Sequence, residues 1–195
     1  MNDTLVLADA GCRVRIDAAR GGRIASLRVC GEELLVGPCD DPLAWGSYPL
    51  APWAGRLRTG RFRFEGREYR LPCNSGPHAI HGTVFTRRWQ IVADDTLRIE
   101  LAPDWPFDGF AVQRFALRGN GLDVRLELHA RTQAYPASAG FHPWFRRRLG
   151  RGEAVELDLD AAQRVVLDGE GFPTGTLDKA QTASGDDCFI GLRRD

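Results

Sequence analysis

The stretch "FALRGNGLDVRLEL", residues 115–128, decides the fold class. Apolar and polar residues alternate along it, and a period of two places successive side chains on opposite faces of a β-strand. Gly119 and Gly121 interrupt the alternation and fit the tight turn that joins two antiparallel strands. The stretch therefore predicts a β-hairpin.

The same alternation recurs along the chain, in residues 13–18, 61–71, 89–101 and 154–160. Glu65–Gly66 and Asp94–Asp95 divide two of these runs, which predicts two further hairpins and, with the first, a meander. No window of eleven or more residues carries the apolar stripe of a helix. We therefore predict an all-β protein with the architecture of a sandwich of large antiparallel sheets.

Composition and charge exclude several classes of function. The chain of 195 residues holds 26 basic and 26 acidic residues, interleaved throughout, so it lacks the basic surface that nucleic-acid binding requires. It begins without a basic leader followed by an apolar run, and no later segment approaches eighteen apolar residues. We expect a cytoplasmic protein that binds neither nucleic acid nor a membrane, folded as one domain.

The cysteines are five in number, which is odd, and none lies in a C-x-x-C pair. This pattern favours reduced thiols over a disulfide framework. Since free cysteine is among the most buried residue types, we expect most of the five to be buried.

The segments between the alternating runs are unusual for loops, because they are rich in Pro, Gly, Trp and His. They comprise residues 46–60, 73–82, 103–110 and 135–145. Binding groups often lie on connecting segments held by a rigid frame, so these loops predict a lined cleft. A tryptophan ring beside polar donors suits a sugar, whose C–H face stacks on the ring. The alternative is that the tryptophans fill the ends of the sandwich as core side chains.

The four histidines divide into two kinds. His129 continues an alternating run and is interpreted as an ordinary strand residue, whereas His78, His81 and His142 lie beside Pro and Gly in the unusual loops. A metal site of two histidines and one carboxylate is one alternative, with Asp186 as the acidic ligand. The three-residue spacing of His78 and His81 argues against it, because neighbouring ligands on one strand usually lie two residues apart. We therefore expect no metal.

Five short motifs occur in order along the chain. They are "APWAGRLRTGRFRFEGREYRLP" (51–72), "GPHAIHG" (76–82), "WPF" (105–107), "GFHPWF" (140–145) and "DDCF" (186–189). In this order and spacing they resemble the aldose 1-epimerase, or galactose mutarotase-like, family across almost the whole chain. The resemblance implies a large antiparallel β-supersandwich, with residues 1–195 forming one domain of that fold.

The resemblance also implies a role for each motif residue. His142 is expected to be the general acid that protonates the sugar ring oxygen, and His81 to contact the sugar near its anomeric centre. Arg56 and Asp186 are expected to bind sugar hydroxyls. His78 and Trp144 complete the predicted substrate-binding set, with His78 mainly orienting its loop. The implied partner is a monosaccharide, and acid–base ring opening needs neither a metal nor an organic cofactor.

The chain departs from the family at three places. The family continues past its Asp-x-x-Phe motif with strands that carry the glutamate base, so the expected domain is incomplete at its C-terminus. Gly55 replaces a usual asparagine, and Ser138 replaces a usual glycine. Acidic residues in nearby hairpins and loops are the remaining candidates for a base: Glu65, Glu68, Asp104 and Asp108.

Two functions follow from these observations. The first is an aldose 1-epimerase that interconverts the α and β anomers of a hexose. The second is a carbohydrate-binding domain of the same fold with impaired or lost catalysis, in which the arginine run of residues 146–148 is a candidate for recognising a hexose 6-phosphate. An incomplete sheet would leave an apolar face and an edge uncovered, which predicts a homodimer.

Overall fold

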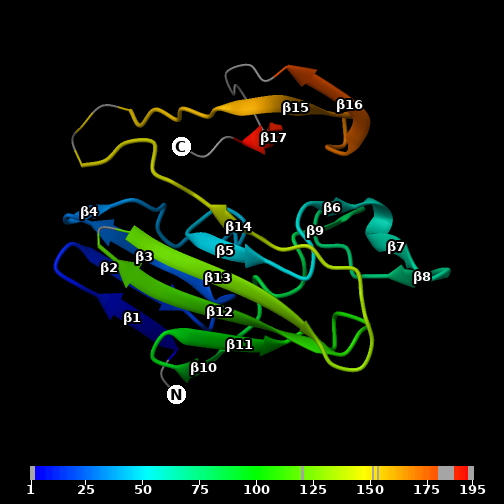
Figure 1. The fold of residues 1–195 in the computed structure, drawn as a ribbon, viewed down its shortest axis with the longest axis horizontal. Coiled ribbons are helices and arrows are strands. Elements are labelled where there is room, and N and C mark those ends of the chain that lie inside the picture. Colours follow the sequence, from blue (N-terminus) through cyan, green and yellow to red (C-terminus); the bar gives the residue numbers. More distant parts are fainter. Residues whose placement is uncertain (1–2, 120, 151, 153, 180–186, 193–195) are drawn as a thin grey trace. The chain divides into compact units, whose positions relative to one another are not determined.

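The structure is a computed structural model that describes residues 3–119, 121–150, 152, 154–179 and 187–192. Within this part of the chain every paired strand is antiparallel (Figure 1), apart from an isolated parallel bridge between Ala51 and Gly82. The prediction of an all-β fold with antiparallel sheets is confirmed. The chain divides into two compact units, Met1–Ala154 and Val155–Asp195. The expected single domain stays a prediction.

The large unit contains two main sheets. The six-stranded sheet has the order β1-β2-β3-β5-β14, with β4 paired to β3, and the four-stranded sheet has the order β10-β11-β12-β13. The strands of the first are β1 (Thr4–Ala8), β2 (Cys12–Asp17), β3 (Arg23–Val29), β4 (Glu32–Glu33), β5 (Ser47–Leu50) and β14 (Gly140–Pro143). Those of the second are β10 (Gln90–Ala93), β11 (Thr96–Glu100), β12 (Gly109–Arg118) and β13 (Gly121–Ala130).

Two short ribbons complete the large unit. β6 (Arg56–Leu57) pairs with β9 (Ala79–Ile80), and β7 (Arg61–Phe64) pairs with β8 (Arg67–Arg70). A single 3-10 turn, Arg58–Gly60, joins β6 to β7. β9 lies between His78 and His81, so its pairing with β6 holds the backbone beside both histidines.

The predicted hairpins are present, but they do not all join one meander. β10–β11 and β12–β13 form hairpins of the four-stranded sheet, whereas β7–β8 forms a separate two-stranded ribbon. His129 lies on β13 opposite Phe110, and the two rings stack with centroids 4.6 Å apart. Its interpretation as a strand residue is therefore confirmed.

The two main sheets share one apolar core. On β2 the fully buried Val14 and Ile16 alternate with Arg13 and Arg15, so the arginines lie on the outward face of the sheet. The core also takes in β11 and β12, including Leu97, Ile99, Ala111 and Phe115. The alternation read from the sequence thus corresponds to an inward and an outward face.

The alternative reading of the tryptophans holds for four of the five. Trp45, Trp53, Trp89 and Trp105 are 2–7% exposed and are core side chains. Trp144 differs, since it is 39% exposed. Burial alone therefore selects Trp144 as the tryptophan whose ring remains accessible for stacking on a ligand.

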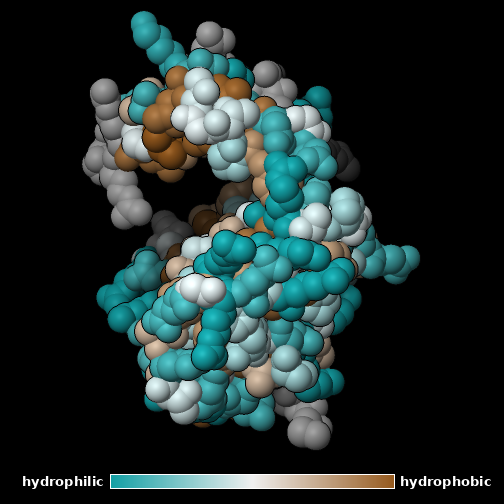
Figure 2. Space-filling model, turned by 90° about the vertical axis from the view of Figure 1, so that its right-hand side faces the viewer, coloured by the Kyte–Doolittle hydropathy of each residue, from teal (hydrophilic) through white to brown (hydrophobic). Residues whose placement is uncertain are grey.

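The small unit contains one three-stranded sheet with the order β16-β15-β17. Its strands are β15 (Ala161–Leu167), β16 (Pro173–Lys179) and β17 (Cys188–Leu192). The alternating run 154–160, predicted to be a strand, forms no strand: beyond a bridge at Ala154 it is irregular. Alternation marks a strand only where a neighbour supplies hydrogen bonds, and this run has no such neighbour among the described residues. Figure 2 shows apolar side chains gathered on the small unit, which exposes Val155, Leu157, Leu159, Leu177, Ile190 and Leu192.

The expected burial of the cysteines is wrong. All five are free thiols, but only Cys12 is buried, and Cys30, Cys39, Cys73 and Cys188 are exposed. Cys30 begins the turn before β4 and has a φ of 50°, so its position is set by the turn and not by packing. In the part of the chain that the structure describes, no helix is long and apolar enough to cross a membrane.

Candidate functional site

The first candidate histidine, His81, lies in a tightly constrained backbone. It directly follows β9 and has a φ of 64°, and Gly82 after it has a φ of 81°. A Cβ placed on Gly82 would lie 1.8 Å from the carbonyl oxygen of Ala51. Only glycine permits this close approach of two backbone segments. The glycine of the His-Gly pair is therefore a requirement of the backbone at this position.

Gly55 fixes both the backbone and the ring of His81. The His81 N–H donates to the Gly55 carbonyl at 2.9 Å, and the Gly55 N–H donates to His81 Nδ1 at 3.3 Å. Because Nδ1 accepts a hydrogen bond, the neutral imidazole carries its proton on Nε2. The ring can then donate a hydrogen bond to an oxygen atom of a ligand.

The second candidate, His142, lies on β14 directly opposite Tyr48 on β5. The two rings stack with centroids 4.9 Å apart and planes within 9°. His142 also stacks against Trp144, at 5.6 Å and 24°. The Tyr48 hydroxyl and the Trp144 Nε1–H both donate to the Leu43 carbonyl, at 3.2 and 2.7 Å. One backbone carbonyl thus holds both aromatic neighbours of His142.

The two histidines come together although they lie in distant segments of the chain. Their ring centroids are 5.2 Å apart in an edge-to-face arrangement, and Tyr48 also contacts His81 at 6.4 Å. We call His81 and His142 the histidine pair. Ser138 helps to join the segments, since its hydroxyl accepts the N–H of Ala54 at 3.0 Å and its own N–H donates to the Pro52 carbonyl.

Tyr48 was not predicted from the sequence, although its ring contacts both histidines of the pair. Residues 46–60 were expected to form a loop, but Ser47–Leu50 is a fully buried strand. Burial raises the pKa of Tyr48 to about 12, against the opposing effects of Trp144 and Arg23. The phenol therefore stays neutral near pH 7 and acts as a packing and hydrogen-bonding group. The alternation of Ser47, Tyr48 and Pro49 before Leu50 was too short to reveal the strand.

Arg23 is a second missed residue, and it is a buried cation. It is 1% exposed, and its guanidinium carbon lies 5.0 Å from the ring centroid of Tyr48 and 4.2 Å from that of Trp45. Its Nη atoms donate to the carbonyls of Trp45 and Phe85. Burial lowers the pKa of Arg23 to about 10, which leaves it charged near neutral pH. Tyr48 is therefore supported by a fixed cation.

The remaining predicted site residues occupy different positions. His78 is buried at 8% exposure, and its Nδ1 accepts the N–H of Thr59 at 3.1 Å, so it orients the loop. Arg56 lies on β6, half-buried, opposite Ile80 and next to Gly55. Asp186 lies outside the described residues. The substrate contacts of all three stay predictions.

The described residues contain no group of three or more His, Cys, Asp or Glu side chains that could hold a metal ion.

Three of the acidic residues considered as a base form ion pairs: Glu68 with Arg61, Asp104 with Arg87, and Asp108 with Arg131. Glu65 is exposed in the β7–β8 turn with a φ of 49°. None of these contacts places a carboxylate beside the histidine pair.

Comparison with known proteins settles the family. The model of the family described as aldose 1-epimerase matches residues 3–187. The chain belongs to the aldose 1-epimerase family. The resemblance read from the five motifs is thereby confirmed, and the fold is that of the galactose mutarotase-like proteins.

Relatives and solved structures of this aldose 1-epimerase family agree with the fold. The uncharacterized protein YihR of Escherichia coli K12 is 32% identical over 166 residues, which cover 79% of this chain and 54% of YihR. A GalM/aldose epimerase homologue from C. elegans superposes with a TM-score of 0.75 at 21% identity, covering 98% of this chain and 65% of that chain. A putative aldose 1-epimerase from E. coli K12 gives 0.72 at 22% identity, covering 91% and 62%. The chain thus spans between half and two thirds of the length of these proteins.

Proposed function

We propose that this chain interconverts the α and β anomers of a hexose by acid–base opening of the sugar ring. The observation that carries the proposal is the histidine pair, with its ring centroids 5.2 Å apart, in a member of the aldose 1-epimerase family. Two imidazoles at this separation suit two reacting oxygen atoms of one sugar. We assign to the pair one proton donor and one hydrogen-bond donor for the oxygen atoms of the sugar.

The proposed chemistry assigns different work to the two histidines. Ring opening passes the proton of the C1 hydroxyl to a water molecule and adds a proton from an imidazolium to the ring oxygen, after which the C1–C2 bond rotates and the ring closes on the opposite face. We assign His142 as the acid, because its motif matches the family motif that carries this role and imidazole commonly acts as a general acid near neutral pH. His81 donates a hydrogen bond from Nε2 to a sugar oxygen, since Gly55 occupies Nδ1.

Binding of the sugar is assigned to the residues around the pair. Trp144 stacks on His142 and is 39% exposed, so its ring offers an accessible surface to the C–H face of a sugar. Arg56, which adjoins the Gly55 contact with His81, and Asp186 are assigned to the sugar hydroxyls. His78 acts through the loop that it orients.

The second candidate function is carbohydrate binding with little or no turnover. It is favoured by the ion pairs of Glu68, Asp104 and Asp108, which occupy three carboxylates considered as a general base. A well-placed general base typically contributes about 10² to 10⁴ in rate. In its absence the cleft would bind the sugar but accelerate ring opening weakly.

Exchange between the two anomers, measured by saturation transfer in proton NMR, tests the proposal. We expect the chain to accelerate exchange of glucose or galactose above the spontaneous rate, and His142→Ala to lower the enzymatic rate by about 10²-fold or more. His129→Ala is the matched control, because His129 stacks on Phe110 on β12, outside the histidine pair. Sugar binding without acceleration would support the second function. Equal acceleration by the His142→Ala variant and the wild type would refute the assignment of the acid.

A further inference from the structure

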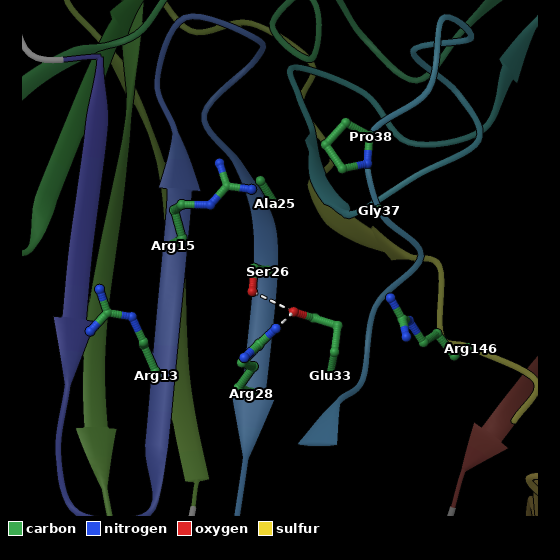
Figure 3. Close-up of a pocket in the computed structure, with 9 residues that line it drawn as sticks. All are labelled: Arg13, Arg15, Ala25, Ser26, Arg28, Glu33, Gly37, Pro38 and Arg146. Atoms are coloured by element: carbon green, nitrogen blue, oxygen red, sulfur yellow. Dashed lines mark hydrogen bonds and ion pairs between the residues drawn. The ribbon is translucent and has the colours of Figure 1, made fainter. Parts of the chain in front are cut away.

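A pocket of about 420 Å³ lies on the outward face of β2 and β3, and four arginine side chains line it (Figure 3). Arg13 and Arg15 come from β2, Arg28 comes from β3, and Arg146 follows β14. None of the residues that line this pocket belongs to the histidine pair or to its aromatic neighbours. Its volume falls within the range of about 300–1,000 Å³ that is usual for small-molecule pockets.

The arginines are placed where like charges meet. Arg13 and Arg28 are direct partners across the β2–β3 pair, and like charges directly opposite each other destabilise a sheet. Neither Arg13 nor Arg15 has an ion pair within the described residues. Their positive charges are therefore not neutralised by that part of the protein.

Glu33 is the one acidic side chain among these residues, and its oxygens are already engaged. It accepts hydrogen bonds from the Ser26 hydroxyl at 2.5 Å and from the backbone N–H groups of Leu27 and Leu35 at 2.9 and 3.2 Å. It also lies 3.6 Å from Arg28 Nε (Figure 3). Burial alone would raise the pKa of Glu33, but these hydrogen bonds and Arg146 lower it, so the carboxylate stays charged. One negative charge thus faces four positive charges.

Arg146 is anchored so that part of its guanidinium remains available. Its backbone N–H donates to the Leu34 carbonyl and its Nε donates to the Leu35 carbonyl, each at 2.9 Å. An arginine has five N–H donors, so the two Nη groups can still bind a ligand. Of the arginine run 146–148, Arg146 is the member that enters the pocket.

We propose that this arginine pocket binds the phosphate group of a phosphate monoester, at a site separate from the histidine pair. Guanidinium groups match the geometry of phosphate oxygens and form paired, charge-assisted hydrogen bonds with them. A dianionic phosphate also removes the repulsion between Arg13 and Arg28. The cavity exceeds the space that an inorganic phosphate ion needs, so it has room for the organic part of an ester.

Isothermal titration calorimetry at about 0.15 M salt, where exposed charges are screened beyond about 8 Å, tests the proposal. The probes are glycerol 3-phosphate, inorganic phosphate and, as the neutral control, glycerol, none of which is a sugar that the histidine pair would bind. The test variant is R13Q/R15Q, which breaks no ion pair of the described residues. The matched control is R61Q/R63Q, an Arg-x-Arg pair on β7 that removes the same charge and contacts Glu68. Thermal melts confirm that both variants fold.

We expect R13Q/R15Q to weaken phosphate-ester binding at least about tenfold, since each lost charge-assisted hydrogen bond is worth about a factor of ten or more. The R61Q/R63Q control should leave binding unchanged. Tighter binding of glycerol 3-phosphate than of inorganic phosphate supports an organic ester, and equal binding supports free phosphate as the source. No binding of either phosphate probe, or equal weakening in both variants, would overturn the proposal. Unchanged anomer exchange in R13Q/R15Q separates this result from that of the proposed function.

Discussion

Replacement of Gly82 by alanine tests whether backbone packing positions His81. Gly82→Ala places a Cβ 1.8 Å from the Ala51 carbonyl oxygen, where side-chain Cβ atoms essentially never approach within 3.0 Å. The two segments must separate by about 1 Å, and the Ala51 carbonyl then weakens its 2.9 Å hydrogen bond from the Thr83 N–H. That bond is worth about 0.5–1.5 kcal/mol, and an alanine in left-handed backbone costs about 1–2 kcal/mol. We expect the free energy of unfolding to fall by about 1.5–3.5 kcal/mol.

Gly66→Ala is the matched control. Gly66 lies in the β7–β8 turn with a φ of 76°, close to the 81° of Gly82, but a Cβ there meets no atom within 4 Å. Gly66→Ala should lower the free energy of unfolding only by the cost of alanine in left-handed backbone, about 1–2 kcal/mol. Urea denaturation measures both values, and anomer exchange should fall about 10²-fold in Gly82→Ala alone, because a displacement of about 1 Å at a reacting group has that effect. Equal losses of stability in the two variants, with exchange unchanged, would refute the reasoning.

Three further predictions follow from burial and charge. Trp144→Ala should weaken sugar binding about tenfold, measured by titration, with little change in the melting temperature. Trp45→Ala, at a core position that is 2% exposed, should lower the free energy of unfolding by about 3–5 kcal/mol, measured from melting curves. Glu33→Gln should destabilise the fold at pH 7, because the pKa of Glu33 is lowered in the folded state despite its burial. Because the pKa of Glu33 is lower in the folded than in the unfolded state, where it is about 4.3, its carboxylate stabilises the fold above about pH 4.3, and this stabilisation is lost as the pH falls through the folded pKa. The unfolding free energies of the wild type and Glu33→Gln should therefore converge in acid. A thiol reagent should label four cysteines of the native protein rapidly and Cys12 slowly, since Cys12 is buried and burial raises its pKa. Mass spectrometry measures the labelling rate of each cysteine, and equal rates for all five would contradict this prediction.

The features predicted from the sequence are those whose cause is local. The β12–β13 hairpin is specified by its own alternation and by the glycines of its turn, and both lie within a few residues. β5 and β14 were expected to be loops because prolines interrupt them. They are strands because they pair with each other, although they lie far apart in the chain, and this pairing places Tyr48 opposite His142. Conversely, run 154–160 alternates but finds no strand partner among the described residues.

The candidate site divides in the same way. His81 and His142 stand out in the sequence because histidine beside glycine or proline in an aromatic-rich loop is unusual, and both carry family motifs. Tyr48 and Arg23 are missed because their importance comes from burial and from the pairing of β3, β5 and β14 in one sheet. The tautomer of His81 is also invisible in the sequence, since it depends on the Gly55 backbone N–H.

The site depends on a main-chain atom, the Leu43 carbonyl oxygen, which accepts hydrogen bonds from both Tyr48 and Trp144. Every amino acid carries the same carbonyl, so a substitution at position 43 keeps the acceptor in place as long as the backbone keeps its path. A substitution at position 43 therefore keeps the acceptor for the two rings that flank His142, although it changes the packing of this side chain against the Tyr48, Leu50 and Phe85 cluster. Deletion or insertion of one residue between Asp41 and Trp45 would move that oxygen. A change in the length of this segment would therefore displace both rings at once, whereas a substitution at position 43 leaves their shared acceptor in place.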